Sequence, residues 1–173
     1  MRGLLSPRAI LPGASNPIWI RTADEDDVAE LAVYFAKLSG AARYNRFMGA
    51  VGDLSRRARD CLVPPRRSDF FTLVAECDEQ GRRAVIGEAS YGYDRIEGRG
   101  EFAISVCDHV QRHGLGSALL AALQSRALSL GRPVLFGETL KDNERMKSLA
   151  RKSGFQFTRS SDWRAVRFDK KLA

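Results

Sequence analysis

The chain has 173 residues with a hydrophobic content of 44%, which is enough for one well-filled core and short for two domains. Lysine and arginine outnumber aspartate and glutamate by 28 to 21, and the resulting net charge of +7 favours polyanionic partners in general. Three cysteines without a Cys-x-x-Cys spacing argue against a disulfide framework and a zinc site, and no apolar run approaches the length of a membrane span. We therefore expect a cytoplasmic protein that binds neither a metal nor a membrane.

The N-terminal residues 1–16 carry Pro, Gly, Ser and Asn with two arginines, and they are expected to form a weakly ordered arm before a single domain over residues 17–173. A short strand is predicted from Ile18 to Ile20. Thr22 or Asp24 can cap the helix that follows. The buried face of this helix repeats at helical spacing: Val28, Leu31, Ala32, Phe35 and Leu38. Gly40 is expected to end it.

A second helix, or a pair of short helices, is predicted from Ala41 to Leu62, where apolar residues recur at helical spacing. Five arginines lie on the other side of this stretch: Arg43, Arg46, Arg56, Arg57 and Arg59. They are interpreted as a solvated basic face, with substrate binding as the alternative. Pro64 and Pro65 end the helical stretch.

Three antiparallel strands are predicted next, namely Phe70 to Cys77, Arg83 to Tyr93 and a strand that begins at Glu101. The third strand alternates strictly between two kinds of side chain. Its strongly apolar face is Phe102, Ile104 and Val106, and its smaller face is Ala103, Ser105 and Cys107.

A glycine pair lies between that strand and a helix predicted from Leu115 to Gly131, in the segment Gln111-Arg112-His113-Gly114-Leu115-Gly116-Ser117. Glycines let backbone amides approach a ligand, and a helix start adds unpaired N–H groups and a partial positive charge. The segment therefore predicts a phosphate cradle, although the glycines could also merely ease a tight turn. The dinucleotide fingerprint fits poorly because Leu119 stands at its last position, and no Walker Gly-Lys-Ser/Thr occurs.

The C-terminal part adds a short strand from Pro133 to Glu138 and a helix capped by Asp142 or Asn143. Gly154 is expected to stop this helix. Two strands, Phe155 to Thr158 and Ala165 to Phe168, close the sheet.

The pattern Gln111-x-x-Gly114-x-Gly116 after a strand resembles the acyl-CoA pyrophosphate loop of the GNAT superfamily of N-acetyltransferases, and so does the order of the elements. The chain looks most like the catalytic domain of Pat-type bacterial protein-lysine acetyltransferases. The likeness rests on Arg43-Tyr44-Asn45-Arg46-Phe47 with Leu54-Ser55, on Gly100-Glu101-Phe102-Ala103 and on Asn143-Glu144-Arg145-Met146. The resemblance implies an α/β (α+β) GNAT fold. That fold is a mixed, mostly antiparallel central sheet of six to seven strands with about four helices, splayed between the strands near Val106 and Val134.

The same resemblance implies that acetyl-CoA is the co-substrate and lies in the splay. The residues implied to bind it are Ile104, Ser105, Val106, Gln111, Arg112, His113, Gly114, Leu115, Gly116, Ser117, Asn143 and Met146. Lys147, Arg151 or Lys152 would add charge for its phosphates. Backbone amides near Val106 would stabilise the thioester oxygen. Ala150 stands where many members have a tyrosine that protonates the thiolate.

An amine acceptor must lose a proton before it can attack. Deprotonating a lysine with a pKa of about 10.4 costs about 4–5 kcal/mol at neutral pH, so the site needs a base. By resemblance, Glu101 matches the base of Pat-type enzymes and Glu138 matches the base of other members. From the residues alone, both are ordinary carboxylates at strand ends, and the resemblance favours Glu101.

The implied function is an acyl-CoA-dependent N-acetyltransferase that acts by direct attack of an amine, with a protein lysine as one candidate acceptor. The alternatives are a small-molecule amine and a catalytically silent acyl-CoA-binding module. Nucleic acid is not an expected partner, because the chain shows no aromatic-basic recognition motif. The chain is expected to act as a monomer or a homodimer.

Overall fold

The structure is a computed structural model that describes residues 17–62, 69–79 and 81–173. The predicted arm of residues 1–16 and the two prolines after the second helical stretch lie outside the described residues. Seven strands form one sheet in the order β1-β2-β3-β4-β5-β7-β6. Every neighbouring pair is antiparallel except β4 and β5. The strands are β1 (Ile18–Thr22), β2 (Phe70–Glu79), β3 (Arg82–Asp94), β4 (Arg99–Val106), β5 (Val134–Leu140), β6 (Gln156–Arg159) and β7 (Ala165–Lys171).

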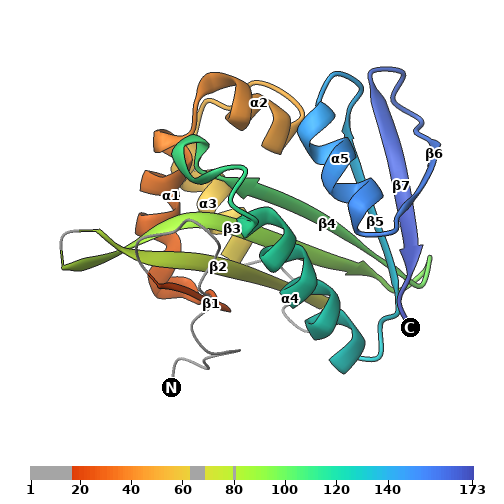
Figure 1. Ribbon diagram of the computed structural model, residues 1–173, viewed down its shortest axis with the longest axis horizontal. Helices are drawn as coiled ribbons and strands as arrows, with labels where there is room; N and C mark the ends of the chain where they lie inside the picture. Colours follow the sequence, from red (N-terminus) through yellow and green to blue (C-terminus); the bar gives the residue numbers. More distant parts are fainter. Residues whose placement is uncertain (1–16, 63–68, 80) are drawn as a thin grey trace.

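Five α-helices cover the two faces of this sheet in the described part of the chain: α1 (Val28–Lys37), α2 (Gly40–Phe47), α3 (Leu54–Leu62), α4 (Leu115–Ser129) and α5 (Glu144–Lys152). Short 3-10 turns, η1 (Glu25–Asp27) and η3 (Asp108–Val110), precede α1 and α4. In Figure 1, α4 crosses the near side of the sheet and α3 lies behind it. The predicted mixed, mostly antiparallel fold is confirmed, and the stretch from Ala41 to Leu62 is the pair of short helices.

The structure decides one alternative and corrects one prediction in the segment from Thr22 to Phe47. Asp24 caps the η1 turn that leads into α1, because its side chain accepts a hydrogen bond from the Asp26 amide and its own amide donates to the Asp27 carboxylate. The prediction that Gly40 ends the first helix is wrong. The helix α1 already ends at Lys37, and Gly40 opens α2 behind Ser39, whose hydroxyl accepts from the Ala42 amide. Serine is a strong N-cap, so it starts a new helix at a point where glycine alone suggested only a stop.

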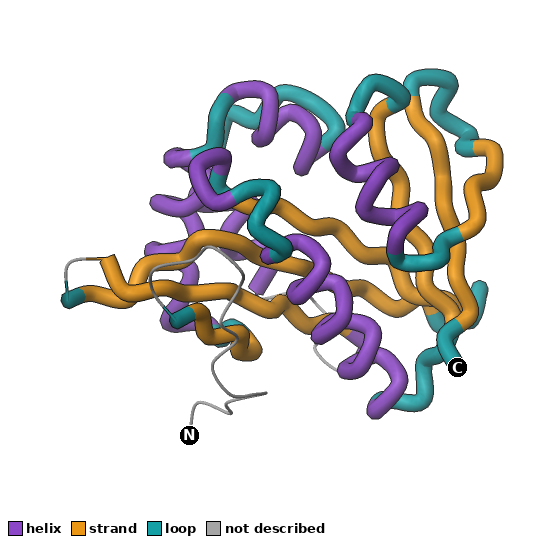
Figure 2. Tube along the Cα trace, in the orientation of Figure 1, coloured by secondary structure: helices purple, strands orange, loops and turns teal. Residues whose placement is uncertain are grey.

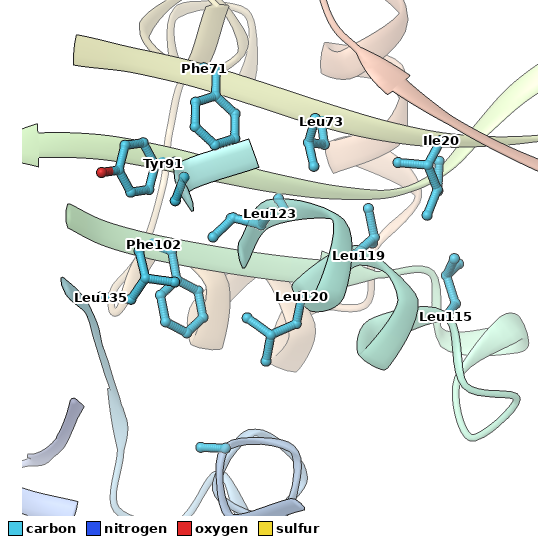
Figure 3. Close-up of a cluster of buried hydrophobic side chains, with 14 of the residues drawn as sticks. Ile20, Phe71, Leu73, Tyr91, Phe102, Leu115, Leu119, Leu120, Leu123 and Leu135 are labelled. Carbon is cyan, nitrogen blue, oxygen red and sulfur yellow. The ribbon is translucent and has the colours of Figure 1, made fainter. Parts of the chain in front are cut away.

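The larger hydrophobic core lies between the sheet and α4. Four leucines of α4 are fully buried against the sheet, where they meet aliphatic and aromatic side chains of the strands (Figure 3): Leu115, Leu119, Leu120 and Leu123. Burying a leucine contributes roughly 1.5–3 kcal/mol. Ala150 of α5 belongs to the same core. The start of α4, which carries the glycine pair, is therefore held firmly on this face.

A second core lies on the opposite face, between the sheet and the helices α1 and α3. Its buried members include Leu31 and Phe35 of α1, Ala58 of α3 and Val74 of β2. This core ends near the middle of the sheet, because α1 and α3 contact β2 and β3. The two cores together pack β2 and β3 from both sides.

Gly100 on β4 is the position where the sheet tolerates a side chain least. A Cβ atom there would lie 2.1 Å from the ring of Tyr91, which is itself fully buried and stacked on Phe71. We expect Gly100→Ala to lower the free energy of unfolding by about 1–3 kcal/mol, because the ring has no free space to move into. Gly92→Ala is the matched control, since its Cβ would meet Phe70 at an ordinary 3.5 Å. Urea denaturation measures both, and equal effects would contradict this packing.

Candidate active site

The sheet is split between β4 and β5. These parallel strands share only two register pairs, Gly100 with Leu135 and Glu101 with Phe136. Beyond them β5 stays paired with β7 as far as Leu140. Figure 2 shows the two traces close together near the C-terminus and diverging from there. The predicted splay between these strands is confirmed, but it opens towards Val106 and Leu140, whereas Val134 lies at the closed end.

The edge of β4 that faces this gap presents main-chain N–H and C=O groups that do not pair with β3. The Cys107 amide donates to the Ile86 carbonyl of β3 at 2.9 Å. In an antiparallel ladder, pairs that exchange hydrogen bonds alternate with pairs that do not. The register therefore turns the N–H and C=O groups of Ile104 and Val106 away from β3 and into the gap. The Val106 carbonyl accepts a hydrogen bond from Nε2 of Gln111 at 2.9 Å, as this direction requires.

The glycine pair forms a turn with backbone amides at its surface. Arg112 and Gly114 have positive φ angles of 71° and 88°, and Gly114 is the N-cap of α4. The first intrahelical bond runs from Ala118 to the Gly114 carbonyl. Among the described residues, no carbonyl is recorded as accepting from the amides of residues 112–117. Unpaired amide donors at a helix start are what a phosphate cradle requires, and the cradle itself stays a prediction.

The side chains of this segment point in different directions. Leu115 is buried in the α4 core, so only its backbone can serve a ligand. A Cβ on Gly116 would lie 3.5 Å from Leu149 of α5, which shows how closely α5 approaches the cradle. Arg112, His113 and Ser117 are exposed. The segment can therefore hold an anion mainly through its backbone.

The start of α5 borders the other side of the gap. Asn143 is its cap, because Oδ1 accepts from the Met146 amide at 3.1 Å and Nδ2 donates to Thr139 Oγ1 at 2.9 Å. Met146 is half-buried against the α4 core. Arg145 donates to Oε1 of Gln111. The predicted cofactor-binding residues of β4, of the turn before α4 and of α5 therefore lie around the split between β4 and β5.

The basic side chains of α5 are not equivalent. Lys147 is engaged by the Lys141 carbonyl and by Glu144, both at 2.5 Å. Arg151 and Lys152 are exposed. We expect the double variant Arg151→Ala/Lys152→Ala to weaken CoA binding by no more than about tenfold at low salt and hardly at all at 0.5 M salt, because exposed contacts are worth about 1 kcal/mol or less. Calorimetry at both salt concentrations measures this, and wild-type affinity at low salt would show that these two residues are only a solvated face.

Glu101 and Glu138 lie on the same face of the sheet, opposite α4. Glu101 is in parallel register with Phe136, and Glu138 follows Phe136 by two residues. The exposed Glu101 carboxyl group is partly desolvated by the surrounding protein, which raises its pKa, and repulsion from Glu138 raises the pKa further. Arg167 and Arg46 oppose this rise in the pKa. Glu101 therefore has the character of a base that protonates more readily than an ordinary glutamate.

The surroundings of the two carboxyl groups differ. Glu138 Oε1 accepts a hydrogen bond from the Ser160 hydroxyl at 3.2 Å. Phe136, between the two glutamates, has the guanidinium groups of Arg99 and Arg167 at 5.0 and 3.9 Å from its ring centre. The face thus combines two carboxylates with two cations held by one aromatic ring.

Arg46 is the residue that the sequence analysis misjudged. It is not part of a solvated face, since its side chain is only 8% exposed and pairs with the fully buried Glu88 of β3. Arg56, Arg57 and Arg59 are exposed as predicted. One signal could have revealed the pair. Glu88 interrupts the otherwise apolar or small run of β3, and a carboxylate buried in a strand requires a cation as its partner.

The side chain of Ser105, which the resemblance implied to bind acetyl-CoA, lies in a buried polar cluster. Its hydroxyl donates to Glu88 Oε1 at 2.6 Å and lies 2.9 Å from the hydroxyl of Tyr34 of α1. The residue is buried. The alternation of the β3–β4 ladder directs its backbone N–H and C=O groups at Glu88 of β3, so Ser105 turns no polar group to the gap.

Two other observations concern the molecule as a whole. No helix of the described residues is both long enough and apolar enough to cross a membrane. Two surface hollows, of about 310 and 430 Å³, lie away from the gap, beside the start of α3 and beside β1. Both are broadly open to solvent, so the backbone edge and the cradle of the gap remain the better-founded site.

Comparison with known proteins agrees with this geometry. Residues 18–156 match the family described as acetyltransferase (GNAT) domain. A curated relative, acetyltransferase PA5475 of Pseudomonas aeruginosa strain PAO1, is 27% identical over 145 residues, which are 84% of this chain and 78% of the relative.

Solved structures share the fold. The GNAT domain of S. lividans PAT superimposes with a TM-score of 0.83 at 21% identity, over 97% of both chains. The structure of yncA, a putative acetyltransferase from Salmonella typhimurium with its cofactor acetyl-CoA, superimposes with a TM-score of 0.66 at 24% identity, over 90% of this chain and 94% of that one. The Pat domain is one of several such neighbours.

The chain belongs to the GNAT acetyltransferase family, because the family match covers most of its length. It is an acyl-CoA-dependent N-acetyltransferase. Acetyl-CoA is the acyl donor that this fold binds.

Proposed function

We propose that this enzyme acetylates the side-chain amine of a protein lysine and that Glu101 is its general base. The observation that carries the proposal is the position of Glu101. It lies at the last register pair before β4 and β5 part, on the open face, and its pKa is raised. A base must stand next to the reacting centre, and this is where the gap begins.

The described residues fit acetyl-CoA in that gap. The amides of residues 112–117 suit the pyrophosphate, since they combine unpaired donors with the positive end of α4. The edge of β4 at Ile104 and Val106 suits the amide-rich pantetheine arm. Asn143 and Met146 border the same passage from α5. The co-substrate supplies the activated acetyl group.

The chain's own groups then have distinct tasks. Glu101 takes the proton from the acceptor ammonium, directly or through a water, so that the amine lone pair can form the N–C bond. The N–H of Val106 or Ile104 stabilises the negative charge that develops on the carbonyl oxygen. As the C–S bond breaks, the CoA thiolate leaves and takes a proton from solvent, while the nitrogen releases its second proton to solvent and becomes the neutral amide. By the family resemblance, Ala150 stands where many members have a tyrosine, and alanine offers no proton to the thiolate. Cys107 is not the nucleophile, since burial raises the pKa of its thiol to about 11.

Exposed aromatic side chains towards the Leu140 end of the gap favour a macromolecular acceptor over a small one. Trp163 in the loop between β6 and β7 is 80% exposed, and Tyr44 of α2 is 42% exposed. Arg164 of this loop donates to Asp162, which raises the pKa of its guanidinium, and the nearby Tyr44 of α2 raises it further. Large exposed aromatic side chains are typical of surfaces that contact other proteins. A pocket for a small amine would instead enclose its ligand.

Turnover with different acceptors tests the proposal. Acetyl-CoA carrying a ¹³C-labelled acetyl group is incubated with the enzyme and either a lysine-containing protein mixture, a polyamine, an aminoglycoside or free amino acids. We expect labelled acetyl-lysine in proteins, detected by mass spectrometry, at a rate well above that of the small amines. A polyamine or aminoglycoside acetylated faster than every protein would identify a small-molecule enzyme instead.

A further inference from the structure

A buried ion pair lies beneath the reacting strand. Arg46 of α2 donates to Glu88 of β3 through Nε at 2.5 Å and through Nη2 at 3.1 Å. Nη2 also donates to Ser90 Oγ at 2.9 Å. Both charged side chains are almost completely withdrawn from water, at 8% and 0% exposure. Such a forked contact fixes the relative position of the two groups as well as their distance.

The pair continues to β4. Glu88 Oε1 accepts the hydroxyl of Ser105, which Tyr34 of α1 contacts from the other side. Ser105 and Glu88 are also direct register partners in the β3–β4 ladder. A single set of hydrogen bonds therefore joins α1, α2, β3 and β4. It ends on the residue between Ile104 and Val106, the two residues whose amides face the gap.

The position of these hydrogen bonds indicates that they hold β4 in place. Replacing a buried ion pair by well-packed apolar side chains often does not destabilise a protein, so the pair is weak evidence for a role in stability. At Ser105, however, β4 has already lost β5 as a neighbour on one edge. The strand needs another constraint where its amides must meet a ligand.

We propose that Arg46 is a positioning residue for acetyl transfer, acting through Glu88 and Ser105 to hold the amides of Ile104 and Val106 where the thioester carbonyl lies. Arg46 does not touch the co-substrate. The inference rests on the proposed placement of acetyl-CoA in the gap. It adds a residue of α2, which lies outside the cradle, to the residues that recognise the acetyl group.

The ratio of the affinities for acetyl-CoA and CoA tests this role, because only acetyl-CoA presents the carbonyl oxygen. Calorimetry without an acceptor is carried out on wild type, Arg46→Lys and Ser105→Ala. Lysine keeps the charge but loses the fork, and Ser105→Ala breaks only the last link. In both variants we expect the ratio to fall about threefold to tenfold, the value of one hydrogen bond, with CoA affinity within about twofold of wild type. Amide hydrogen exchange at Cys107, whose amide donates to Ile86 of β3, should become faster in both.

Arg21 provides a matched control. Its side chain is equally buried, and it pairs with Asp27 at 2.7 Å and with Glu76 at 2.6 Å at the β1 edge of the sheet. Arg21→Lys should lower stability without changing the affinity ratio. If Arg21→Lys lowers the ratio as much as Arg46→Lys, or if folded Ser105→Ala keeps the wild-type ratio, the positioning role is wrong. If wild type binds acetyl-CoA but Gly114→Asp binds it equally well, the proposed placement in the gap is wrong, and the role assigned to Arg46 is wrong with it.

Discussion

Replacing Glu101 by glutamine is expected to lower turnover by about 10²–10⁴ at neutral pH and to leave CoA affinity unchanged, because a positioned base acts on the acceptor and not on the cofactor. The pH dependence follows from the raised pKa of Glu101. In wild type the rate should fall as the pH falls through this pKa, which is raised above the ordinary value of a glutamate, since the carboxyl group must be ionised to accept a proton. In the variant the rate should partly recover as the pH rises, because the acceptor then deprotonates by itself.

Glu138→Gln is the matched control for this prediction. Glu138 lies on the same face, and its Oε1 accepts a hydrogen bond from the Ser160 hydroxyl. We expect a milder loss of turnover. Steady-state rates of both variants from pH 6 to 10 decide the assignment. If Glu138→Gln is the slower enzyme, Glu138 is the base and the site works as in the other members of the family.

Gly114→Asp is expected to weaken CoA binding by tens of fold or more. The φ angle of 88° suits glycine, and a left-handed conformation costs other residues about 1–2 kcal/mol. The new carboxylate would also stand among the donors meant for the pyrophosphate. Calorimetric titration with CoA measures the loss.

Gly114→Asn separates the two causes. Asparagine has the shape of aspartate and tolerates the left-handed region better than most residues, but it carries no charge. We expect its loss of affinity to be clearly smaller. If a folded Gly114→Asp protein binds CoA with unchanged affinity, the pyrophosphate does not bind at this turn.

The sequence was sufficient for most of the fold because the strongest patterns are local. The alternation in β4, the leucine repeat of α4 and the glycine spacing between them each reflect one element and its immediate neighbour. The error at Gly40 was also local. Glycine was interpreted without Ser39, the residue before it, whose hydroxyl starts α2.

The candidate site was less predictable because its geometry depends on contacts between distant elements. The resemblance pointed to Glu101, but only the register with Phe136 places it on the face of Glu138. Arg46 had the spacing of a surface arginine on an amphipathic helix. Its partner lies 42 residues away on β3, and no local pattern reports such a pairing. The same pairing explains why the Ser105 hydroxyl faces the core and not the gap.

A crystal structure with acetyl-CoA tests the account most directly. We predict the pyrophosphate on the amides of residues 112–117, the pantetheine arm along the edge of β4 and the thioester carbonyl within hydrogen-bond distance of the Ile104 or Val106 amide. The Glu101 carboxylate should lie within reach of the acetyl carbon through one water. Acetyl-CoA bound outside the gap, or a thioester turned away from Glu101, would contradict the proposed mechanism.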